Sequence, residues 1–311
     1  MSLLVVGSVA FDSVETPFGS RERMLGGSAT HFALAARFFT DVRVVGVVGD
    51  DFTDDHVAVL ETRGIDTEDL ERVVGGQTFF WAGRYSWDLN SPDTLDTQLN
   101  VFADFQPKLS DSSRRSRVVF LGNIQPDLQR EVRAQCEDAV FVALDSMNLW
   151  IDIARDSLVE TIRGVDCVIV NDAEARQLTG EPNLARAART LRGWGPEIVV
   201  AKQGEYGAAL FTGEGFFSLP GYPLETVVDP TGAGDTFAGG FLGYLAAHAG
   251  QPFRDDLFRN AMTYGSALAS FNVEEFGTER VQRLTREEID ARFEEFRRMT
   301  YFETVPLPAS R

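Results

Sequence analysis

The fold and the chemistry of this chain are best interpreted from one stretch, Asp229-Pro230-Thr231-Gly232-Ala233-Gly234-Asp235-Thr236-Phe237-Ala238-Gly239-Gly240. It follows a strand-like segment, Thr226 to Val228, and opens an apolar stretch that runs to about His248, so it predicts a glycine-rich turn leading into a helix. Residues 232–234 lack bulky side chains, so their backbone N–H groups are approachable, and the positive end of the helix dipole adds to their attraction for an anion. Asp235, in the first turn, is placed to take a proton from a hydroxyl. A helix N-terminus with close-packing glycines is the simpler alternative.

Short apolar runs alternate with helical patterns along the rest of the chain. The runs predicted as buried strands are Leu3 to Val9, Val42 to Val48, Val118 to Leu121, Val140 to Leu144, Cys167 to Val170 and Ile198 to Ala201. The predicted helices are Ala29 to Phe39, Phe52 to Arg63, Asp127 to Gln135, Leu184 to Arg192, Asp256 to Phe271 and Arg286 to Arg298. Strand followed by helix, repeated, predicts an α/β fold: a three-layer, Rossmann-like arrangement with a mainly parallel sheet covered on both faces.

Two stretches, at about residues 11–24 and 77–102, break this alternation. In the second stretch, residues 79–86 alternate with the period of two that is typical of a half-exposed antiparallel sheet. We expect the two stretches to form a small β-sheet lid, inserted in a single domain that spans residues 1–311.

Charge and composition exclude several classes of protein. The 311 residues contain 29 Lys and Arg against 47 Asp and Glu, a formal net charge of -18, which repels nucleic acids and anionic membranes. The two cysteines, Cys136 and Cys167, have no spacing typical of a zinc site or a disulfide framework. No segment approaches the roughly 18 to 20 apolar residues that span a bilayer. We therefore expect a cytoplasmic protein that binds neither nucleic acid nor membrane.

The stretch 229–240 resembles the C-terminal signature of the ribokinase-like (PfkB) carbohydrate kinase family, whose pattern is roughly D-[TP]-T-G-A-G-D-[TS]-F. It matches this pattern at every fixed position, and weaker family motifs occur in the expected order over almost the whole chain. The resemblance implies a ribokinase-like kinase that uses ATP and Mg²⁺. It also implies that Asp235 is the catalytic base and that the amides of Gly232, Ala233 and Gly234 form the anion hole.

Motifs near the N-terminus resemble the family's site for the phosphate acceptor. Gly26 and Gly27 match paired glycines that approach the hydroxyls of a sugar, and Asp12 stands where the family uses an acid to hold acceptor hydroxyls. His31 occupies a position where the family commonly has Asn, so the resemblance implies a different polar contact to the acceptor there. The simpler interpretations are a turn, a strand-end acid and a hydrogen-bonded histidine.

Motifs in the second half resemble the family's nucleotide site. The segment from Asn171 to Glu174 is similar to an N-x-x-E element that arranges water and Mg²⁺ around the phosphates, and Mg²⁺ asks for few protein ligands because it keeps most of its waters. Lys202, Gly204 and Gly207 match a K-x-G-x-x-G-[AS] loop that runs along the nucleotide. The alternatives are a helix cap for the first motif and a surface charge for Lys202.

Further site residues follow from weaker signals. Asp229 and the Thr231 carbonyl resemble the family's monovalent-cation site, which implies a candidate K⁺ completed by a late loop, and Thr231 also borders the expected nucleotide. Ser266 is the candidate adenine contact. Asn123 and Asn148 follow predicted strands at their carboxyl ends, where open α/β sheets bind ligands, so each either contacts the acceptor or closes a turn.

Together these residues predict an ATP-dependent phosphotransferase that moves the γ-phosphoryl group of ATP to a hydroxymethyl group of a sugar. The alternative is a nucleoside kinase on the same scaffold, in which Phe79, Trp81 and Phe102 of the lid would supply an apolar slot for a base. A non-catalytic sensor of sugar or nucleotide is disfavoured, because binding alone does not require the acid, the glycine amides and the N-x-x-E pair together. The aromatic alternation of the lid is also a candidate surface for a homodimer.

Overall fold

The computed structural model describes residues 2–305, and nine of the strands in this range form one large sheet. The order of the strands is β13-β12-β11-β10-β9-β8-β1-β4-β5. From β11 to β5 the neighbours run parallel, whereas β12 and β13 are antiparallel to their neighbours. The strands are β1 (Ser2–Val6), β4 (Asp41–Val48), β5 (Ile65–Arg72), β8 (Val118–Leu121), β9 (Phe141–Asp145), β10 (Cys167–Asn171), β11 (Ile198–Lys202), β12 (Ala208–Phe211) and β13 (Phe216–Leu219).

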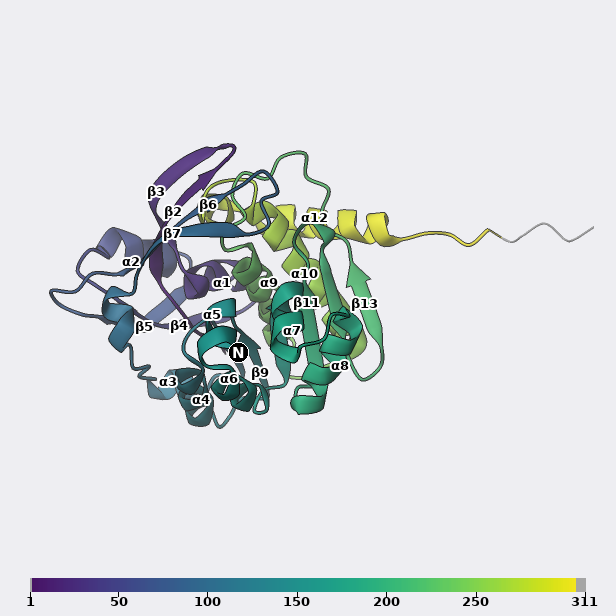
Figure 1. Cartoon of the computed structure of the whole chain (residues 1–311), viewed down its shortest axis with the longest axis horizontal. Helices are drawn as coiled ribbons and strands as arrows, with labels where there is room; N and C mark the ends of the chain where they lie inside the picture. The colour runs from purple at the N-terminus through teal and green to yellow at the C-terminus, as the bar shows by residue number, and fades with distance from the viewer. Residues whose placement is uncertain (1, 306–311) are drawn as a thin grey trace, which may run out of the picture.

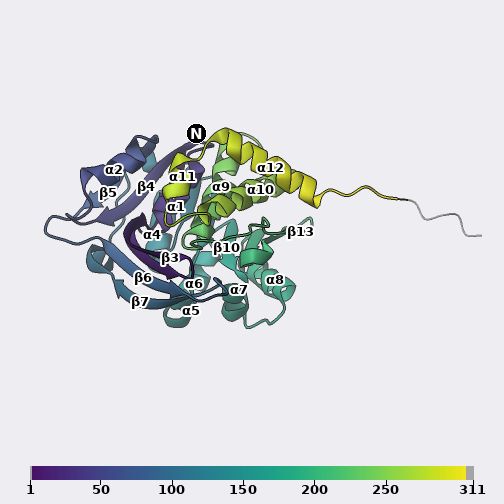
Figure 2. The ribbon, with the colours of Figure 1, turned by 90° about the horizontal axis from the view of Figure 1, so that it is seen from above.

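Successive residues of a strand point to separate hydrophobic clusters on the two faces of this sheet. In β1, Leu3 and Val5 belong to one cluster, whereas Leu4 and Val6 belong to the other. Because both faces are covered by helices, the central strands are continuous apolar runs, which is why the sequence predicted them. The mainly parallel, three-layer α/β fold is thereby confirmed (Figures 1 and 2).

The helices divide between the two faces. The cluster of Leu3 and Val5 is covered by α1 (Ser28–Ala36), α9 (Ala233–Ala247) and α10 (Asp255–Asn272). The opposite cluster is covered by α4 (Pro126–Gln135), α6 (Arg155–Ile162), α7 (Asp172–Thr179) and α8 (Leu184–Trp194). The remaining helices are α2 (Asp54–Glu61), α3 (Asp111–Arg114), α5 (Asn148–Ile153), α11 (Glu279–Arg283) and α12 (Arg286–Thr300), with short 3₁₀ turns η1 (Asn100–Asp104) and η2 (Gly204–Tyr206). In residues 2–305, no helix combines the length and the apolar character that crossing a bilayer requires.

A second, smaller sheet is formed by the two stretches that break the strand–helix alternation. Its order is β3-β2-β6-β7, with β2 (Ala10–Thr16), β3 (Gly19–Gly26), β6 (Phe79–Tyr85) and β7 (Pro92–Gln98). The β2–β3 and β6–β7 pairs are antiparallel, as expected, but the central pair β2–β6 is parallel. The cause is topological, because β2 and β6 follow β1 and β5, which run in the same direction in the large sheet.

Three further differences from the sequence prediction concern strands of the large sheet and the segment before α9. The strand-like segment Thr226 to Val228 is not a strand, although the Val228 N–H donates to the Val273 carbonyl at 2.8 Å. Strand β5 was not predicted, because it is an edge strand in which Ile65 and Leu70 are the only apolar residues among eight. The hairpin β12–β13 was also missed, because each of its strands has four residues and shows no clear period.

Helix α9, which carries Asp235, packs closely between α1 and α10. A Cβ atom on Gly239 would lie 2.3 Å from the backbone oxygen of Phe32 in α1. We therefore predict that Gly239→Ala lowers the free energy of unfolding by about 1–3 kcal/mol, measured by urea denaturation. The matched control is Gly193→Ala in α8, where no atom lies within 4 Å of the new methyl group; it should raise stability by roughly 0.5–1 kcal/mol. Equal stability of the two variants would contradict the close packing of α9.

Candidate active site

A tight turn at residues 230–234 starts helix α9. Gly232 has a φ of 72°, in the left-handed region, and a Cβ atom on it would lie 2.3 Å from the ring of His31, so both conformation and space require glycine. The Ala233 N–H donates to the Pro230 carbonyl at 3.2 Å. Of the three amides expected to bind an anion, that of Ala233 is thus used inside the turn, which leaves those of Gly232 and Gly234 for the role.

Asp235 is half-buried in the first turn of α9 and lies close to charged groups. Burial and then the charge of Asp145 raise the pKa of its carboxyl to about 7, although the charge of Lys202 opposes the rise. A carboxylate with a pKa near neutrality is suited to accept a proton from a hydroxyl group.

Lys202 reaches from the carboxyl end of β11 to the start of α9. Its Nζ donates to Asp145 Oδ2 at 2.8 Å, and it lies 3.0 Å from where a Cβ atom on Gly234 would stand. Asp145 is the last residue of β9 and was missing from the predicted site. Its signal in the sequence was an acid directly after an apolar run, which places it at the carboxyl edge of the sheet.

Asn171 and Glu174 form a capping box at the start of α7. The Glu174 N–H donates to Asn171 Oδ1 at 2.7 Å, and the Asn171 N–H donates to Glu174 Oε2 at 2.8 Å. The pair therefore caps the helix, which was the simpler interpretation. Glu174 is also buried, and burial followed by the charge of Asp145 raises its pKa to about 7. Its carboxyl thus belongs to one acidic cluster with Asp145 and Asp235.

The residues predicted to hold the acceptor lie on the strands of the small sheet. Asp12 in β2 is buried against Gly26, the last residue of β3, where a Cβ atom would stand 2.0 Å from the Asp12 carboxylate. Burial raises the pKa of Asp12 to about 7, a hydrogen bond from the Gly27 backbone opposes the rise, and the charges of Asp229 and Asp235 add to it. The structure therefore brings Asp12, Gly26 and Gly27 within electrostatic reach of Asp235.

His31 is buried behind the turn at residues 230–234. It is 2% exposed, its ring lies against Gly232, and its Nδ1 lies 3.1 Å from Asn272 Oδ1. Asn272 Nδ2 donates to the Thr231 carbonyl at 2.8 Å, so its oxygen must face His31 and also the Thr236 hydroxyl, which donates to it at 3.0 Å. His31 Nδ1 consequently carries a proton, and burial lowers the pKa of the ring to about 4. His31 thus makes a hydrogen bond inside the protein, which was the alternative interpretation, and its contact with the acceptor stays a prediction.

Asp229 and Thr231, expected to bind K⁺, are hydrogen-bonded to protein groups. Asp229 is fully buried and accepts the N–H groups of Thr231 and Gly277, each at 2.9 Å. The Thr231 carbonyl accepts from Asn272. The expected late loop reaches Asp229 through the Gly277 N–H, and K⁺ binding at these oxygens stays a prediction, because each oxygen keeps a lone pair beyond its hydrogen bond to the protein.

The loop predicted to run along the nucleotide is a glycine-rich turn between β11 and β12. Gly204 and Gly207 have φ values of 57° and 95°, and the Gln203 N–H donates to the Gly207 carbonyl at 2.8 Å. Asn90, in the loop between β6 and β7, approaches this turn: its Oδ1 lies 3.2 Å from where a Cβ atom on Gly204 would stand. Ser266 is buried in α10, on the same face of the large sheet as α9.

Asn123 and Asn148 lie beyond the carboxyl ends of β8 and β9, as predicted. Asn123 Oδ1 accepts from Trp150 Nε1 at 2.8 Å, and its Nδ2 donates to Met147 Sδ at 3.0 Å. Asn148 is exposed on the first turn of α5. The Asn123 amide thus holds the α5 segment, which was the structural alternative.

The aromatic residues suggested as a slot for a base are packed against protein groups. The ring centroids of Phe79 and Phe102 are 5.3 Å apart, and Phe102 also stacks on Phe105. Trp81 packs against the separate cluster that contains Tyr85, and its Nε1 donates to Thr94. These contacts correct the idea that Phe79, Trp81 and Phe102 line one open slot.

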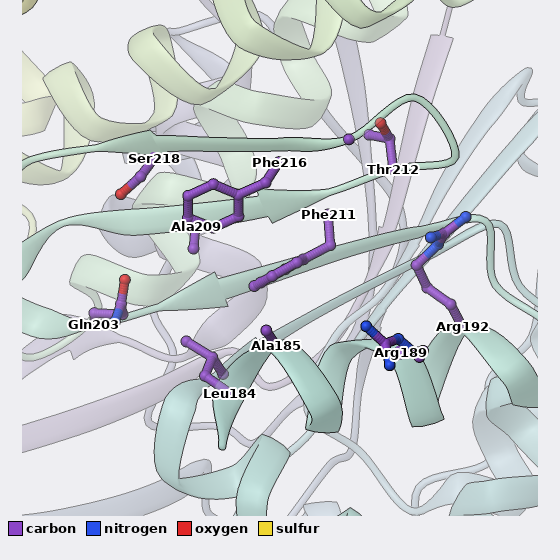
Figure 3. Close-up of a pocket in the computed structure, with 11 residues that line it drawn as sticks. Leu184, Ala185, Arg189, Arg192, Gln203, Ala209, Phe211, Thr212, Phe216 and Ser218 are labelled. Carbon is purple, nitrogen blue, oxygen red and sulfur yellow. The ribbon is translucent and has the colours of Figure 1, made fainter.

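A surface groove of about 660 Å³ lies on the face of β12–β13 that α8 borders (Figure 3). Phe211 and Phe216 from the hairpin and Arg189 and Arg192 from α8 line it. Strand alternation directs Phe211 to this face and Leu210 to the face of α9 and α10. The residues that line the groove do not include the acidic cluster of Asp145, Glu174 and Asp235.

The chain is similar to known kinases of sugars and nucleosides. The chain matches the pfkB family of carbohydrate kinases over residues 3–283. It is 30% identical over 254 residues to a cytidine kinase of Thermococcus kodakarensis, covering 78% of this chain and 87% of the relative.

Two solved structures share the fold. A nucleoside kinase of Burkholderia thailandensis in complex with inosine has a TM-score of 0.77 and 21% identity, covering 94% of this chain and 97% of that one. An aminoimidazole riboside kinase of Salmonella enterica, complexed with aminoimidazole riboside and an ATP analog, has a TM-score of 0.75 and 20% identity, covering 94% and 100%. With the family match over most of its length, the chain belongs to the pfkB family of carbohydrate kinases.

Proposed function

We propose that this kinase transfers the γ-phosphoryl group of ATP to the hydroxymethyl group of a sugar ring. The observation that carries the proposal is the position of Asp235 beside the amides of Gly232 and Gly234, between the acceptor residues of the small sheet and Lys202. In this proposal, the three features supply a base, an anion hole and a cation at one point.

Each group has a defined role in the transfer. Asp12 accepts hydrogen bonds from ring hydroxyls of the acceptor, and Asp235 takes the proton of the hydroxymethyl group. The oxygen then forms a bond to the γ-phosphorus, while the bond from phosphorus to the ADP oxygen breaks and ADP leaves with the electron pair. The Gly232 and Gly234 amides stabilise the charge on the phosphoryl oxygens during the transfer.

The acidic cluster suits a nucleotide bound with Mg²⁺. Asp145, Glu174 and Asp235 place three carboxyls near one ammonium, that of Lys202. Asn171 and Glu174 would hold a hydrated Mg²⁺ through its waters, and the ion would offset charge on the β- and γ-phosphates when bound. The rest of the nucleotide would follow the loop of Gly204 and Gly207, past Thr231 and towards Ser266.

We further propose that the chain is a single domain whose small sheet acts as a lid. The Thr16 hydroxyl in β2 donates to the Val228 carbonyl at 2.9 Å, and the Thr231 hydroxyl donates to Tyr85 Oη in β6 at 3.3 Å. Asn90, between β6 and β7, lies beside Gly204. The small sheet therefore borders both the turn at residues 230–234 and the loop of Gly204 and Gly207, where it would exclude water. A homodimer through this sheet stays a prediction.

A nucleoside is the form of the sugar that we favour as acceptor. The Thermococcus kodakarensis relative, at 30% identity, is a cytidine kinase, and this similarity supports a nucleoside over a free sugar. In this chain, Trp150 is held by Asn123 just beyond the carboxyl ends of β8 and β9, where an aromatic face would stack on a base.

The first prediction tests the base. Asp235→Asn should lower kcat by about 10²- to 10⁴-fold, because the amide cannot accept the proton, while ATP still binds. Turnover is measured by coupled ADP release and ATP binding by calorimetry. The matched control is Asp156→Asn, another acid in the first turn of a helix, which should leave both unchanged. Full turnover by Asp235→Asn would refute the assignment.

The second prediction concerns the support of the turn. Asn272→Ala removes the bonds to Thr231, Thr236 and His31, and each buried group left unpaired costs about 1–3 kcal/mol. The variant should therefore be clearly less stable in urea denaturation and slower in turnover. Asn260→Ala on the same helix, where the side chain bonds to the Asp256 carbonyl, should change stability by roughly 0.5 kcal/mol or less. Equal effects of the two variants would contradict a supporting role for Asn272.

The third prediction tests the acceptor. In a screen of pentoses, hexoses and nucleosides for ADP release, ribonucleosides should give the highest kcat/KM. A 5′-deoxynucleoside, which lacks the hydroxyl that receives the phosphoryl group, should bind without being phosphorylated. Turnover confined to free sugars would exclude the nucleoside acceptor but keep the kinase assignment.

A further inference from the structure

The ion pair between Asp145 and Lys202 crosses the carboxyl edge of the large sheet. Lys202 ends β11 and Asp145 ends β9, with β10 between them. The two groups meet at 2.8 Å, and their side chains are 18% and 7% exposed. The other carboxylate oxygen of Asp145 accepts the N–H of Ser146 at 2.7 Å. Asp145 is therefore held in place from the strand side, and the more mobile lysine side chain is fixed by it.

The fixed ammonium points at the start of α9. Its Nζ lies 3.0 Å from where a Cβ atom on Gly234 would stand, so a side chain larger than hydrogen at this residue would displace it. Gly234 is also one of the amides of the proposed anion hole. The cation and the amide thus lie together at the point where a transferred phosphoryl group would be bound.

We propose that Asp145 is a positioning residue of this kinase: it holds the Lys202 ammonium against Gly234, where that ammonium contacts the transferred phosphoryl group. The inference rests on the proposed function and deepens it, because it names the pair that places the cation. A flexible lysine would otherwise lose side-chain freedom each time it bound phosphate, and Asp145 removes that cost before the nucleotide arrives.

The same pair sets the charge that Asp235 experiences. The charged groups that influence or are influenced by Asp235 are Asp12 from β2, Asp145 from β9, Glu174 from α7 and Lys202 from β11. Asp145 raises the pKa of Asp235, and Lys202 lowers it. Since the base must be deprotonated to act, the acid limb of kcat/KM follows the pKa of Asp235. Loss of either member of the pair should therefore move this limb, in opposite directions.

The experiment compares pH profiles of kcat/KM for the full-length variants, after circular dichroism has shown that they are folded. Asp145→Asn should shift the acid limb to lower pH by about one unit, and Lys202→Met should shift it to higher pH by a similar amount. Lys202→Met should also lower kcat by about 10²-fold, as the loss of one preorganised contact does. Asp145→Asn should lower kcat less, with little change in acceptor KM.

Two further variants keep the test decisive. Asp166→Asn is the control: it removes an acid at the amino end of β10, at the opposite edge of the sheet, where the side chain accepts the Val142 N–H. The acid limb of kcat/KM should stay at the same pH in this variant. If Asp145→Asn does not fold, Lys202→Arg, which keeps the charge, is compared with Lys202→Met, and only the methionine variant should move the limb.

The outcomes separate this inference from the proposed function. Opposite shifts support the pair, whereas unchanged limbs or shifts in the same direction overturn it. Where only the lysine variants fold, an unmoved limb in Lys202→Met overturns it. Retained turnover by Asp235→Asn would instead overturn the proposed base, whatever the pair does.

Discussion

The hydrogen bonds of Asn272 hold the start of helix α9 in place, and the site depends on that helix. One side-chain amide donates to the carbonyl of Thr231, within the turn, and accepts from the hydroxyl of Thr236, after it. The turn is thereby tied to α10, while His31 fills the space behind Gly232. Because α9 also packs closely on α1, its N-terminus has a fixed place at the carboxyl edge of the sheet, next to Lys202.

More acidic than basic side chains lie around the N-terminus of α9. Asp12, Glu174 and Asp235 each have a pKa near 7, mainly because burial disfavours their charged forms. A polyanionic nucleotide would be repelled by such a cluster if it came alone. The amides of the turn, the ammonium of Lys202 and a divalent cation brought with the nucleotide are what make the binding of phosphate favourable in the proposed function.

The buried strands and the turn before α9 could be predicted from the sequence, because each depends on the types of a few neighbouring residues. Strands covered on both faces are apolar runs, and the turn of Gly232 to Gly234 has few residue types compatible with it. Asp235, Asp12, Gly26 and Gly27 could therefore be placed from motifs, and the structure brings them together.

Contacts between distant residues could not be predicted in the same way. The bond of His31 to Asn272 joins positions 241 residues apart, and the pair of Asp145 with Lys202 joins positions 57 apart. Neither has a local pattern, because each depends on which strand ends and helix faces the topology makes neighbours. The edge strand β5 was not predicted for a different reason. Its residues are mostly polar and only partly buried, so its local sequence shows neither an apolar run nor a clear period of two.

The small sheet has a consequence for how this enzyme could change its preference. Asp12 and Gly26, proposed to hold the acceptor, are themselves residues of β2 and β3, and these strands continue directly from β1 of the large sheet. Under the proposed function, the same two strands thus bind the acceptor and close the site over it. A mutation that enlarges the acceptor site for a bulkier alcohol would also change the orientation of the small sheet over that site. Acceptor selectivity and protection from ATP hydrolysis would therefore have to evolve together.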